Sequence, residues 1–462
     1  MTKAWTDIAS LHEGYKLGKF TPSEVTKYYL DRIKKYNPTL NAFITVTDEL
    51  AMSTARKLDK QTCNLPLFGV PVGFKDLFMT KAVKTTAGSK VLENYIGQYN
   101  ATVVQKYLDA GAIMLGKLNC DAWAHGSSGE NSDFGPTRNP WNVEYVPGGS
   151  SSGSAVAVAA DLCLVASGTD TGGSIRCPAS FCGVVGLKPT YGRVSRYGII
   201  AMASSLDSIG HITQNVADAA RVLAVTAGHD PLDATSSSIL VPNYLPVGQV
   251  KNLRVGIPGE YQARGEVNKA FESAKLKLQE LGCELVEISL PHTKDALACY
   301  YIIQPAEVSS NLARYDGIRY GHDRSTFGAE AKRRIMLGTY TLSAGYYDAY
   351  YKTAQKVRTL VVNDFEQAFK KVDVIAAPVG PNLPFKIGEK VFDPLSLYLE
   401  DVLTVPINLA GLPAISIPCG FSKSKLPVGF QLIGSQFSEQ LLFSMAQVYE
   451  QATSFHDQSP PL

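Results

Sequence analysis

Two glycine- and serine-rich loops hold the residues whose types and spacing best suit chemistry. The first contains Gly148-Gly149-Ser150 and the second contains Gly172-Gly173-Ser174. Because glycine has no Cβ, a glycine-rich backbone lets N–H groups approach a substrate closely. A serine hydroxyl beside several N–H donors is what acyl transfer requires, since the tetrahedral intermediate carries an oxyanion. Most loops of this composition are turns or linkers, so the loops alone do not establish a catalytic site.

A serine nucleophile needs a base, and the candidate is a lysine upstream of both loops. Neither loop contains a histidine, whereas Lys75 follows the apolar segment 67–74. That segment is expected to be a buried strand, which would place the lysine at a strand end. A lysine acts as a base only when neutral, and an apolar setting lowers its pKa accordingly. The alternative from the residues alone is a surface ion pair between Lys75 and Asp76.

Segments 69–76, 147–178, 183–196 and 203–210 together resemble the amidase signature family, and the resemblance runs from about Ser23 to the C-terminus. It implies a Ser–Ser–Lys triad in which Ser174 is the nucleophile, Ser150 is the bridging serine and Lys75 is the base. The bridging serine of this family follows a cis peptide bond, for which the bond between Gly149 and Ser150 is the candidate. The implied oxyanion hole consists of the backbone N–H groups of Thr171, Gly172, Gly173 and Ser174.

Within that family, the chain is most similar to the glutaminase subunits of tRNA-dependent amidotransferases. Glutamine offers a carboxylate and an ammonium group, which a selective site pairs with opposite charges. The resemblance implies that Arg334 binds the carboxylate, that Asp401 binds the α-amino group and that Tyr300 lines the pocket. From the residues alone, the same positions would be interpreted as surface charges and a core tyrosine.

The chain departs from the pattern of those subunits at several positions. Ser152 stands in the first loop where they usually have glycine, Gly129 replaces a threonine and Cys177 replaces a glutamine. The segment 320–328 is also shorter, since the relatives carry an extra helical segment there. These differences leave the triad assignment intact but bear on partner docking and on the shape of the pocket.

The resemblance also implies partners. Ammonia from glutamine would pass to a B-type kinase/transferase subunit that uses ATP and magnesium to amidate Glu-tRNA(Gln) or Asp-tRNA(Asn), with a small C-type subunit completing the complex. No cofactor is expected in this chain. Its net charge of +2 indicates that tRNA is bound indirectly, through the complex. The alternative is a stand-alone amidase that hydrolyses small or aryl amides with the same triad.

Three other motifs in the sequence imitate functional sites. Residues 149–153 fit G-x-S-x-G, which would make Ser151 the nucleophile, but the preceding residues are a poor strand. Residues 111–117 imitate a phosphate-binding loop, although Leu118 stands where a magnesium-binding serine or threonine is required. We expect a helix end leading into a strand there. Residues 422–425 match S-x-x-K and are expected to form a polar turn between two strands.

Helical and strand-like segments alternate along the chain. A capping box at Thr21 to Glu24, with proline at the first helical position, predicts the start of a helix. Helix-then-strand pairs are predicted at 103–110 with 112–115, at 267–281 with 284–288, and at 346–371 with 372–377. This pattern predicts an α/β fold, with a central mixed sheet covered by helices on both faces. The stretch 230–238 is expected to be a loop, so we expect one amidase signature domain over residues 1–462.

Composition indicates an ordinary cytoplasmic enzyme. The longest apolar run, at 155–166, is too short for a membrane span and contains Asp161, and the N-terminus lacks the pattern of a signal or transit peptide. The eight cysteines are dispersed and are expected to stay reduced. Neither the cysteines nor the seven histidines show the spacing of a metal site.

Overall fold

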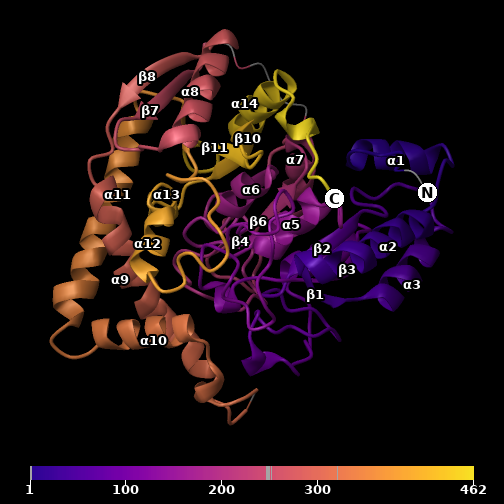
Figure 1. Cartoon of the computed structure of the whole chain (residues 1–462), viewed down its shortest axis with the longest axis horizontal. Helices are drawn as coiled ribbons and strands as arrows, with labels where there is room; N and C mark the ends of the chain where they lie inside the picture. Colours follow the sequence, from indigo (N-terminus) through magenta and orange to yellow (C-terminus); the bar gives the residue numbers. More distant parts are fainter. Residues whose placement is uncertain (1–2, 246–249, 251, 320) are drawn as a thin grey trace.

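The structure is a computed structural model that describes residues 3–245, 250, 252–319 and 321–462. At its centre lies one sheet of eleven strands, which come from the N-terminal, middle and C-terminal parts of the chain (Figure 1). In order across the sheet, the strands are β1 (Phe43–Val46), β3 (Ile113–Leu118), β2 (Pro71–Lys75), β4 (Val165–Asp170), β6 (Ser208–Thr213), β5 (Val185–Lys188), β10 (Ala414–Phe421), β11 (Pro427–Ile433), β9 (Val374–Pro378), β7 (Arg254–Pro258) and β8 (Glu284–Ile288).

The sheet is mixed, as predicted. Strand β2 lies parallel to both β3 and β4, and β7 lies parallel to both β8 and β9. The strands between these two groups pair antiparallel, from β4 through β6, β5, β10 and β11 to β9. Strands β2 to β6 and β9 to β11 are buried along almost their whole length, which requires cover on both faces.

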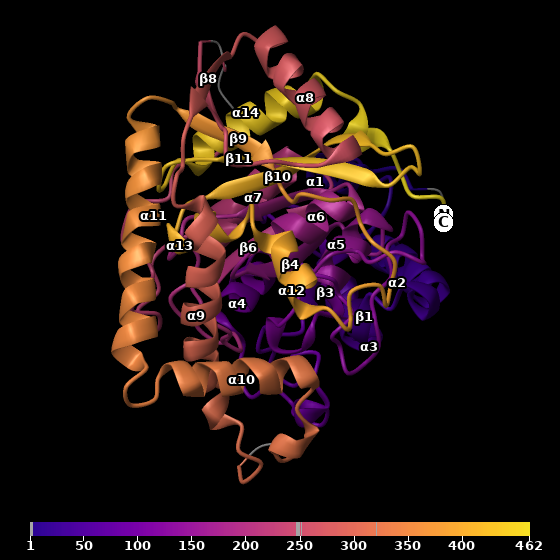
Figure 2. The same cartoon turned by 60° about the vertical axis from the view of Figure 1, so that its left-hand side comes forward.

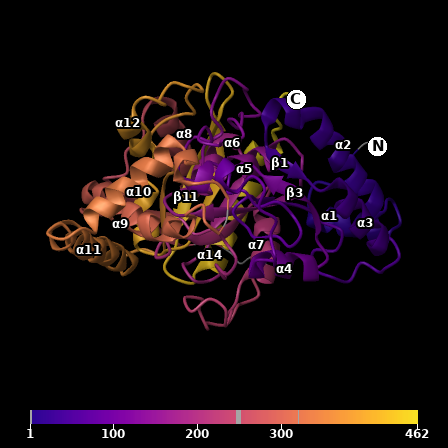
Figure 3. The ribbon, with the colours of Figure 1, turned by 90° about the horizontal axis from the view of Figure 1, so that it is seen from below.

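Helices supply that cover. In the described residues they are α1 (Ile8–Lys16), α2 (Pro22–Leu40), α3 (Asp48–Leu58), α4 (Thr102–Asp109), α5 (Ser152–Ala159), α6 (Arg176–Cys182), α7 (Val216–Thr226), α8 (Gly265–Glu280), α9 (Thr293–Asn311), α10 (Ala329–Thr341), α11 (Thr353–Phe369), α12 (Pro394–Tyr398), α13 (Val405–Leu409) and α14 (Glu439–Gln451). In Figure 2, α8 and α14 lie above strands β9, β11 and β10, while α5 and α6 lie below them. Helices α9, α10 and α11 extend to one side, away from the N-terminal helices α1 to α3 (Figure 3).

Most of the predicted elements are present, with shifted ends. Helix α2 begins at the predicted capping box, where Thr21 and Glu24 cap each other's backbone. Strand β2 begins only at Pro71, because the residues before it turn, with the N–H of Val70 donating to the carbonyl of Leu67. The helix predicted at 346–371 starts as a π-helical turn, Tyr347–Lys352, and continues as α11.

The segments 111–117 and 422–425, which imitate functional motifs, are ordinary connections in the fold. Residues 111–117 follow the end of α4 and run into strand β3, and residues 422–425 form the turn between β10 and β11, both as predicted. Residues 230–238 form turns, as expected. The shortened segment 320–328 starts at a residue outside the described part, and it contains a short 3₁₀ helix, Arg324–Thr326.

The described residues contain no cluster that could hold a metal ion, and their cysteines are all free thiols. Among the described helices, none combines the length and the apolar character that crossing a membrane requires.

Candidate active site

Lys75 lies at the end of β2, between the parallel strands β3 and β4, and has no exposed surface. Its Nζ lies 2.8 Å from Ser150 Oγ, 3.0 Å from Ser151 Oγ and 2.8 Å from Thr169 Oγ1. The sheet therefore brings the predicted base into contact with the first serine loop. Three hydroxyl groups surround the amine, and each can either donate to it or accept from it.

Burial controls the protonation of Lys75. Desolvation lowers the pKa of this lysine to about 8, against the opposing pull of Cys120 and of the nearby carboxylates. The predicted alternative, a surface ion pair with Asp76, is wrong, because the carboxylate of Asp76 lies 3.1 Å from Nζ of Lys117, and both groups are buried. A substantial fraction of Lys75 is thus neutral near pH 8, which is the form that accepts a proton.

The first serine loop has the backbone conformation expected for the bridging serine. The peptide bond between Gly149 and Ser150 is cis. The N–H of Gly149 donates to the carbonyl of Ser127 at 2.8 Å, which ties the loop to a neighbouring segment. A Cβ on Gly149 would lie 2.0 Å from Asp121 Oδ2, so only glycine fits there. This packing holds the Ser150 hydroxyl against Lys75.

Ser174 lies in the second serine loop, between β4 and α6, and is almost fully buried. The two loops meet where the N–H of Ser151 donates to the carbonyl of Ser174 at 3.1 Å. In the described part of the chain, no hydrogen bond joins the hydroxyls of Ser150 and Ser174. The structure thus brings the two loops together and connects Lys75 to Ser150, while the step from Ser150 to Ser174 stays a prediction.

The backbone N–H groups predicted to form the oxyanion hole differ in whether they already donate a hydrogen bond within the protein. The N–H of Gly173 already donates to Asp170 Oδ1 at 2.9 Å, so it is engaged in this structure. No described residue accepts a hydrogen bond from the N–H of Thr171 or Gly172. The side chain of Thr171 donates to Asp207 at 2.7 Å, and Thr404 Oγ1 donates to the carbonyl of Gly172 at 2.5 Å, which fixes the loop on both sides.

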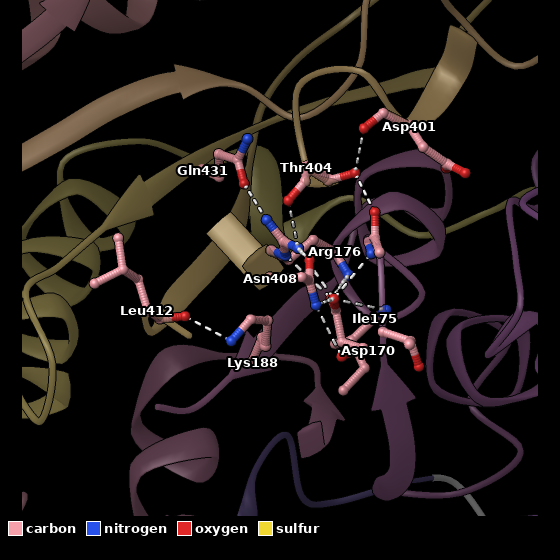
Figure 4. Close-up of polar contacts among 12 residues, drawn as sticks. Asp170, Ile175, Arg176, Lys188, Asp401, Thr404, Asn408, Leu412 and Gln431 are labelled. Carbon is pink, nitrogen blue, oxygen red and sulfur yellow. Dashed lines mark hydrogen bonds and ion pairs between the residues drawn. The ribbon is translucent and has the colours of Figure 1, made fainter. Parts of the chain in front are cut away.

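A buried ion pair behind this loop was not predicted. The carboxylate of Asp170 receives hydrogen bonds from Nε and Nη2 of Arg176, each at 3.0 Å, and from Nδ2 of Asn408 at 2.9 Å (Figure 4). Arg176 also donates to Gln431 Oε1 at 2.8 Å. Although burial opposes ionisation, the Arg176 guanidinium holds the pKa of Asp170 below its ordinary value. The only sequence signal is a pair of opposite charges flanking a loop of small residues.

Two of the predicted pocket residues, Tyr300 and Asp401, lie beside the second serine loop. A Cβ on Gly172 would lie 2.7 Å from Tyr300 Oη, so this tyrosine touches the loop directly. The carbonyl of Asp401 accepts from Thr404 Oγ1, the hydroxyl that also holds Gly172 (Figure 4). Burial raises the pKa of the Asp401 carboxyl to about 7, against the opposing charge of Arg334. A neighbouring cation, such as an α-ammonium group, would favour its ionised form.

Arg334 is buried on α10 rather than exposed at the surface. Its Nε pairs with Glu330 at 2.8 Å, and its Nη1 donates to Gln304 Oε1 at 2.9 Å. The rings of Tyr301 and Tyr398 flank the guanidinium, with centroids 5.3 and 5.4 Å from Cζ. Since Tyr301 Oη donates to Asp401 Oδ2 at 3.2 Å, the cation and the acid belong to one cluster.

Two of the departures, Ser152 and Gly129, compensate for each other. A Cβ on Gly129 would lie 2.7 Å from Cβ of Ser152, so a side chain at one position leaves no room at the other. Ser152 Oγ shares a hydrogen bond with Thr137 at 3.1 Å. The Sγ of Cys177 would lie 3.2 Å from a Cβ on Gly148, so this thiol packs beneath the first serine loop. The imitating serine, Ser151, also contacts Lys75, at 3.0 Å compared with 2.8 Å for Ser150.

Comparisons with known proteins show what the chain is similar to. The Amidase family matches residues 24–443. The A subunit of glutamyl-tRNA(Gln) amidotransferase from Geobacter metallireducens is 52% identical over 474 residues, which is 98% of each chain. Its counterpart from Carboxydothermus hydrogenoformans is 53% identical over 97% of this chain and 98% of its own.

Solved structures show the same fold. The crystal structure of the glutamyl-tRNA(Gln) amidotransferase A subunit from Thermotoga maritima has a TM-score of 0.81 and 43% identity, covering 94% of this chain and 92% of that one. A bacterial aryl acylamidase of the amidase signature enzymes has a TM-score of 0.87 at 26% identity, over 98% of both chains.

Proposed function

This chain belongs to the amidase family, and we propose that it is the glutaminase subunit of a tRNA-dependent amidotransferase, hydrolysing glutamine to glutamate and ammonia. The observation that carries the proposal is the buried Lys75, whose Nζ lies 2.8 Å from Ser150 Oγ beside the second serine loop. The amidase match over 24–443 and the single central sheet support one catalytic domain over residues 1–462.

In the proposed reaction, neutral Lys75 accepts a proton from Ser150, and Ser150 accepts one from Ser174. The Ser174 oxygen attacks the side-chain carbonyl of glutamine, and the N–H groups of Thr171 and Gly172 hold the oxyanion. The proton then passes to the amide nitrogen, the C–N bond breaks and ammonia leaves. Water, deprotonated through the same relay, attacks the ester and releases glutamate, which restores the Ser174 hydroxyl.

The N–H of Gly173 has a different role in this proposal from the one expected. Because it donates to Asp170, it holds the loop in shape together with Arg176 and Asn408. It joins the oxyanion hole only if that hydrogen bond is shared or exchanged when the intermediate forms.

We propose further that the ammonia passes to a B-type kinase/transferase subunit, with a small C-type subunit completing a cytoplasmic complex. That partner would use ATP and magnesium to convert Glu-tRNA(Gln) or Asp-tRNA(Asn) to the amide. The support is the near-complete coverage of relatives that are named as subunits of an amidotransferase. The net charge of +2 supports contact with tRNA mainly through the partners.

The experiment that separates this function from a stand-alone amidase compares two substrates on two neighbouring variants. Arg334→Ala removes the buried cation proposed to bind the carboxylate, while Arg333→Ala removes a more exposed arginine that also pairs with Glu330. A charge-assisted contact contributes about 1.5–3 kcal/mol, so Arg334→Ala should lower kcat/KM for glutamine about ten- to a hundredfold. Hydrolysis of a neutral aryl amide should change little, and Arg333→Ala should leave both reactions within about threefold.

A stand-alone amidase gives the opposite ranking. The aryl amide would be the better substrate of the wild-type protein, and Arg334→Ala would affect both reactions equally. Equal losses on the two substrates would therefore contradict the glutamine-specific proposal. Thermal unfolding of each variant shows whether a loss of activity reflects a loss of fold.

A further inference from the structure

Two buried polar side chains close to Arg334 have hydrogen-bonding atoms without a partner. His125 is 1% exposed, and neither of its ring nitrogens has a hydrogen-bond partner among the described residues. Gln304 is fully buried, and its Nε2 also has no hydrogen-bond partner among the described residues. Leaving a buried polar atom unpaired costs about 1–3 kcal/mol, so such atoms in a folded protein call for an explanation. A polar ligand that binds between them is one.

Gln304 lies on α9 itself, and the segment that leads to His125 packs against residues at the end of α9 and the start of α10. The ring of Trp123 stacks on Phe327, directly before α10, and packs against Tyr315, which follows α9. Trp123 and Ala124 have φ angles of 60° and 63°, a conformation that costs energy in residues other than glycine. His125 follows this turn directly; its ring lies within reach of the charge of Arg334, and its carbonyl accepts from Nδ2 of Asn131 at 2.9 Å.

Gln304 and Arg334 are held together by close packing of α9 against α10. A Cβ on Gly338 would lie 1.8 Å from the carbonyl oxygen of Pro305, so only glycine permits this approach. One helical turn earlier on α10, Arg334 Nη1 donates to Gln304 Oε1 at 2.9 Å. Since the amide oxygen is thereby engaged, the group that Gln304 still has free is the Nε2 donor.

The free groups of this cluster are mainly donors. Burial and the charge of Arg334 lower the pKa of His125 well below its ordinary value, so the ring is neutral and carries one N–H donor in either tautomer. Of the donors on Arg334, Nε and Nη1 bind Glu330 and Gln304, and no described residue accepts from Nη2. Donors from three side chains, one of them the Arg334 cation, suit a carboxylate better than a neutral or cationic group.

We propose that His125 and Gln304 act with Arg334 to bind the α-carboxylate of glutamine, and thereby select a substrate with a free carboxylate. This inference rests on the proposed glutaminase function and adds two specificity-determining residues to it. Neither side chain is assigned a part in bond breaking, so both act on binding and on the discrimination between substrates. Asp401, whose carboxylate accepts a hydrogen bond from Tyr301, would bind the α-ammonium group of the same glutamine.

The test compares glutamine with L-glutaminol, in which a hydroxymethyl group replaces the carboxylate. His125→Met and Gln304→Leu remove the donors at similar side-chain size, while His125→Gln keeps an N–H donor as a matched control. Each donor-free variant should raise KM for glutamine at least tenfold with little change in kcat. KM for glutaminol should stay within about threefold, and His125→Gln should retain most of the affinity for glutamine.

A second measurement does not depend on turnover. Glutamate, the product, should raise the thermal unfolding temperature of the full-length wild-type protein, and this shift should shrink in both donor-free variants. Unchanged KM for glutamine, or equal losses for glutamine and glutaminol, would overturn the assignment of His125 and Gln304 while the glutaminase function stands. A wild-type protein that neither hydrolyses glutamine nor binds glutamate would overturn both.

Discussion

The pH dependence of turnover tests whether Lys75 is the base. Its pKa of about 8 means that the neutral, proton-accepting form grows as pH rises through that value. The neutral fraction is about 3% at pH 6.5 and about 75% at pH 8.5 by the ordinary titration relation. At saturating glutamine, kcat should therefore rise about 25-fold between these two pH values, and log kcat should climb with a slope near one below pH 8.

Saturation matters in this assay because a second pocket group titrates nearby. The Asp401 carboxyl has a pKa of about 7, so below neutral pH it becomes protonated and should bind the α-ammonium less well. That effect raises KM as pH falls, whereas kcat reports the groups that titrate in the enzyme–substrate complex. Release of glutamate, measured at constant ionic strength over pH 6.5–8.5, separates the two parameters.

Lys75→Arg supplies the matched control, because arginine keeps the positive charge but does not lose its proton in this pH range. It should lower kcat at least about 100-fold, the usual contribution of general-base catalysis, and should abolish the rise with pH. A wild-type profile that is flat, or that has its midpoint at about 6.5 as for an ordinary histidine, would refute this account of the base. So would an Arg variant with the wild-type profile.

Two further predictions concern the loop that carries Ser174, the proposed nucleophile. Asp170→Asn leaves the guanidinium of Arg176 buried without a counter-charge, so the free energy of unfolding should fall by about 3–5 kcal/mol in urea denaturation, and an unchanged midpoint would contradict the structural role of this pair. Gly172→Ala would place a Cβ 2.7 Å from Tyr300 Oη and should slow glutamine hydrolysis at least about tenfold. Because Tyr300 Cζ would also lie 2.9 Å from that Cβ, an unchanged rate in Gly172→Ala would argue against this close contact.

Local sequence signals predicted most of the elements and the burial of Lys75 well. The capping box at Thr21 and Glu24 fixed the start of α2, because it depends only on neighbouring residues. The apolar segment before Lys75 predicted a buried strand end, and the lysine is buried there. The predicted start of the helix at 346 was less accurate, since periodicity does not distinguish the π-helical turn Tyr347–Lys352 from an α-helix.

Contacts between distant segments could not be predicted in this way. Arg176 on α6 meets Asn408 on α13 and Gln431 on β11 only through the tertiary fold, since both residues follow more than 200 positions later in the chain. The engagement of the Gly173 N–H depends on how Asp170 is turned, which the loop sequence does not reveal. The orphaned ring of His125 likewise becomes visible only once burial and hydrogen-bond partners are known.

The most direct test of the central claim is to identify the residue that carries the acyl group. The wild-type chain is mixed with glutamine, quenched in acid during turnover, digested and analysed by mass spectrometry, with Ser174→Ala and Ser151→Ala treated in the same way. The account predicts a glutamyl ester on the peptide that contains Ser174, its absence in Ser174→Ala and its persistence in Ser151→Ala. A glutamyl ester on Ser150 or Ser151, or full glutaminase activity in Ser174→Ala, would contradict it.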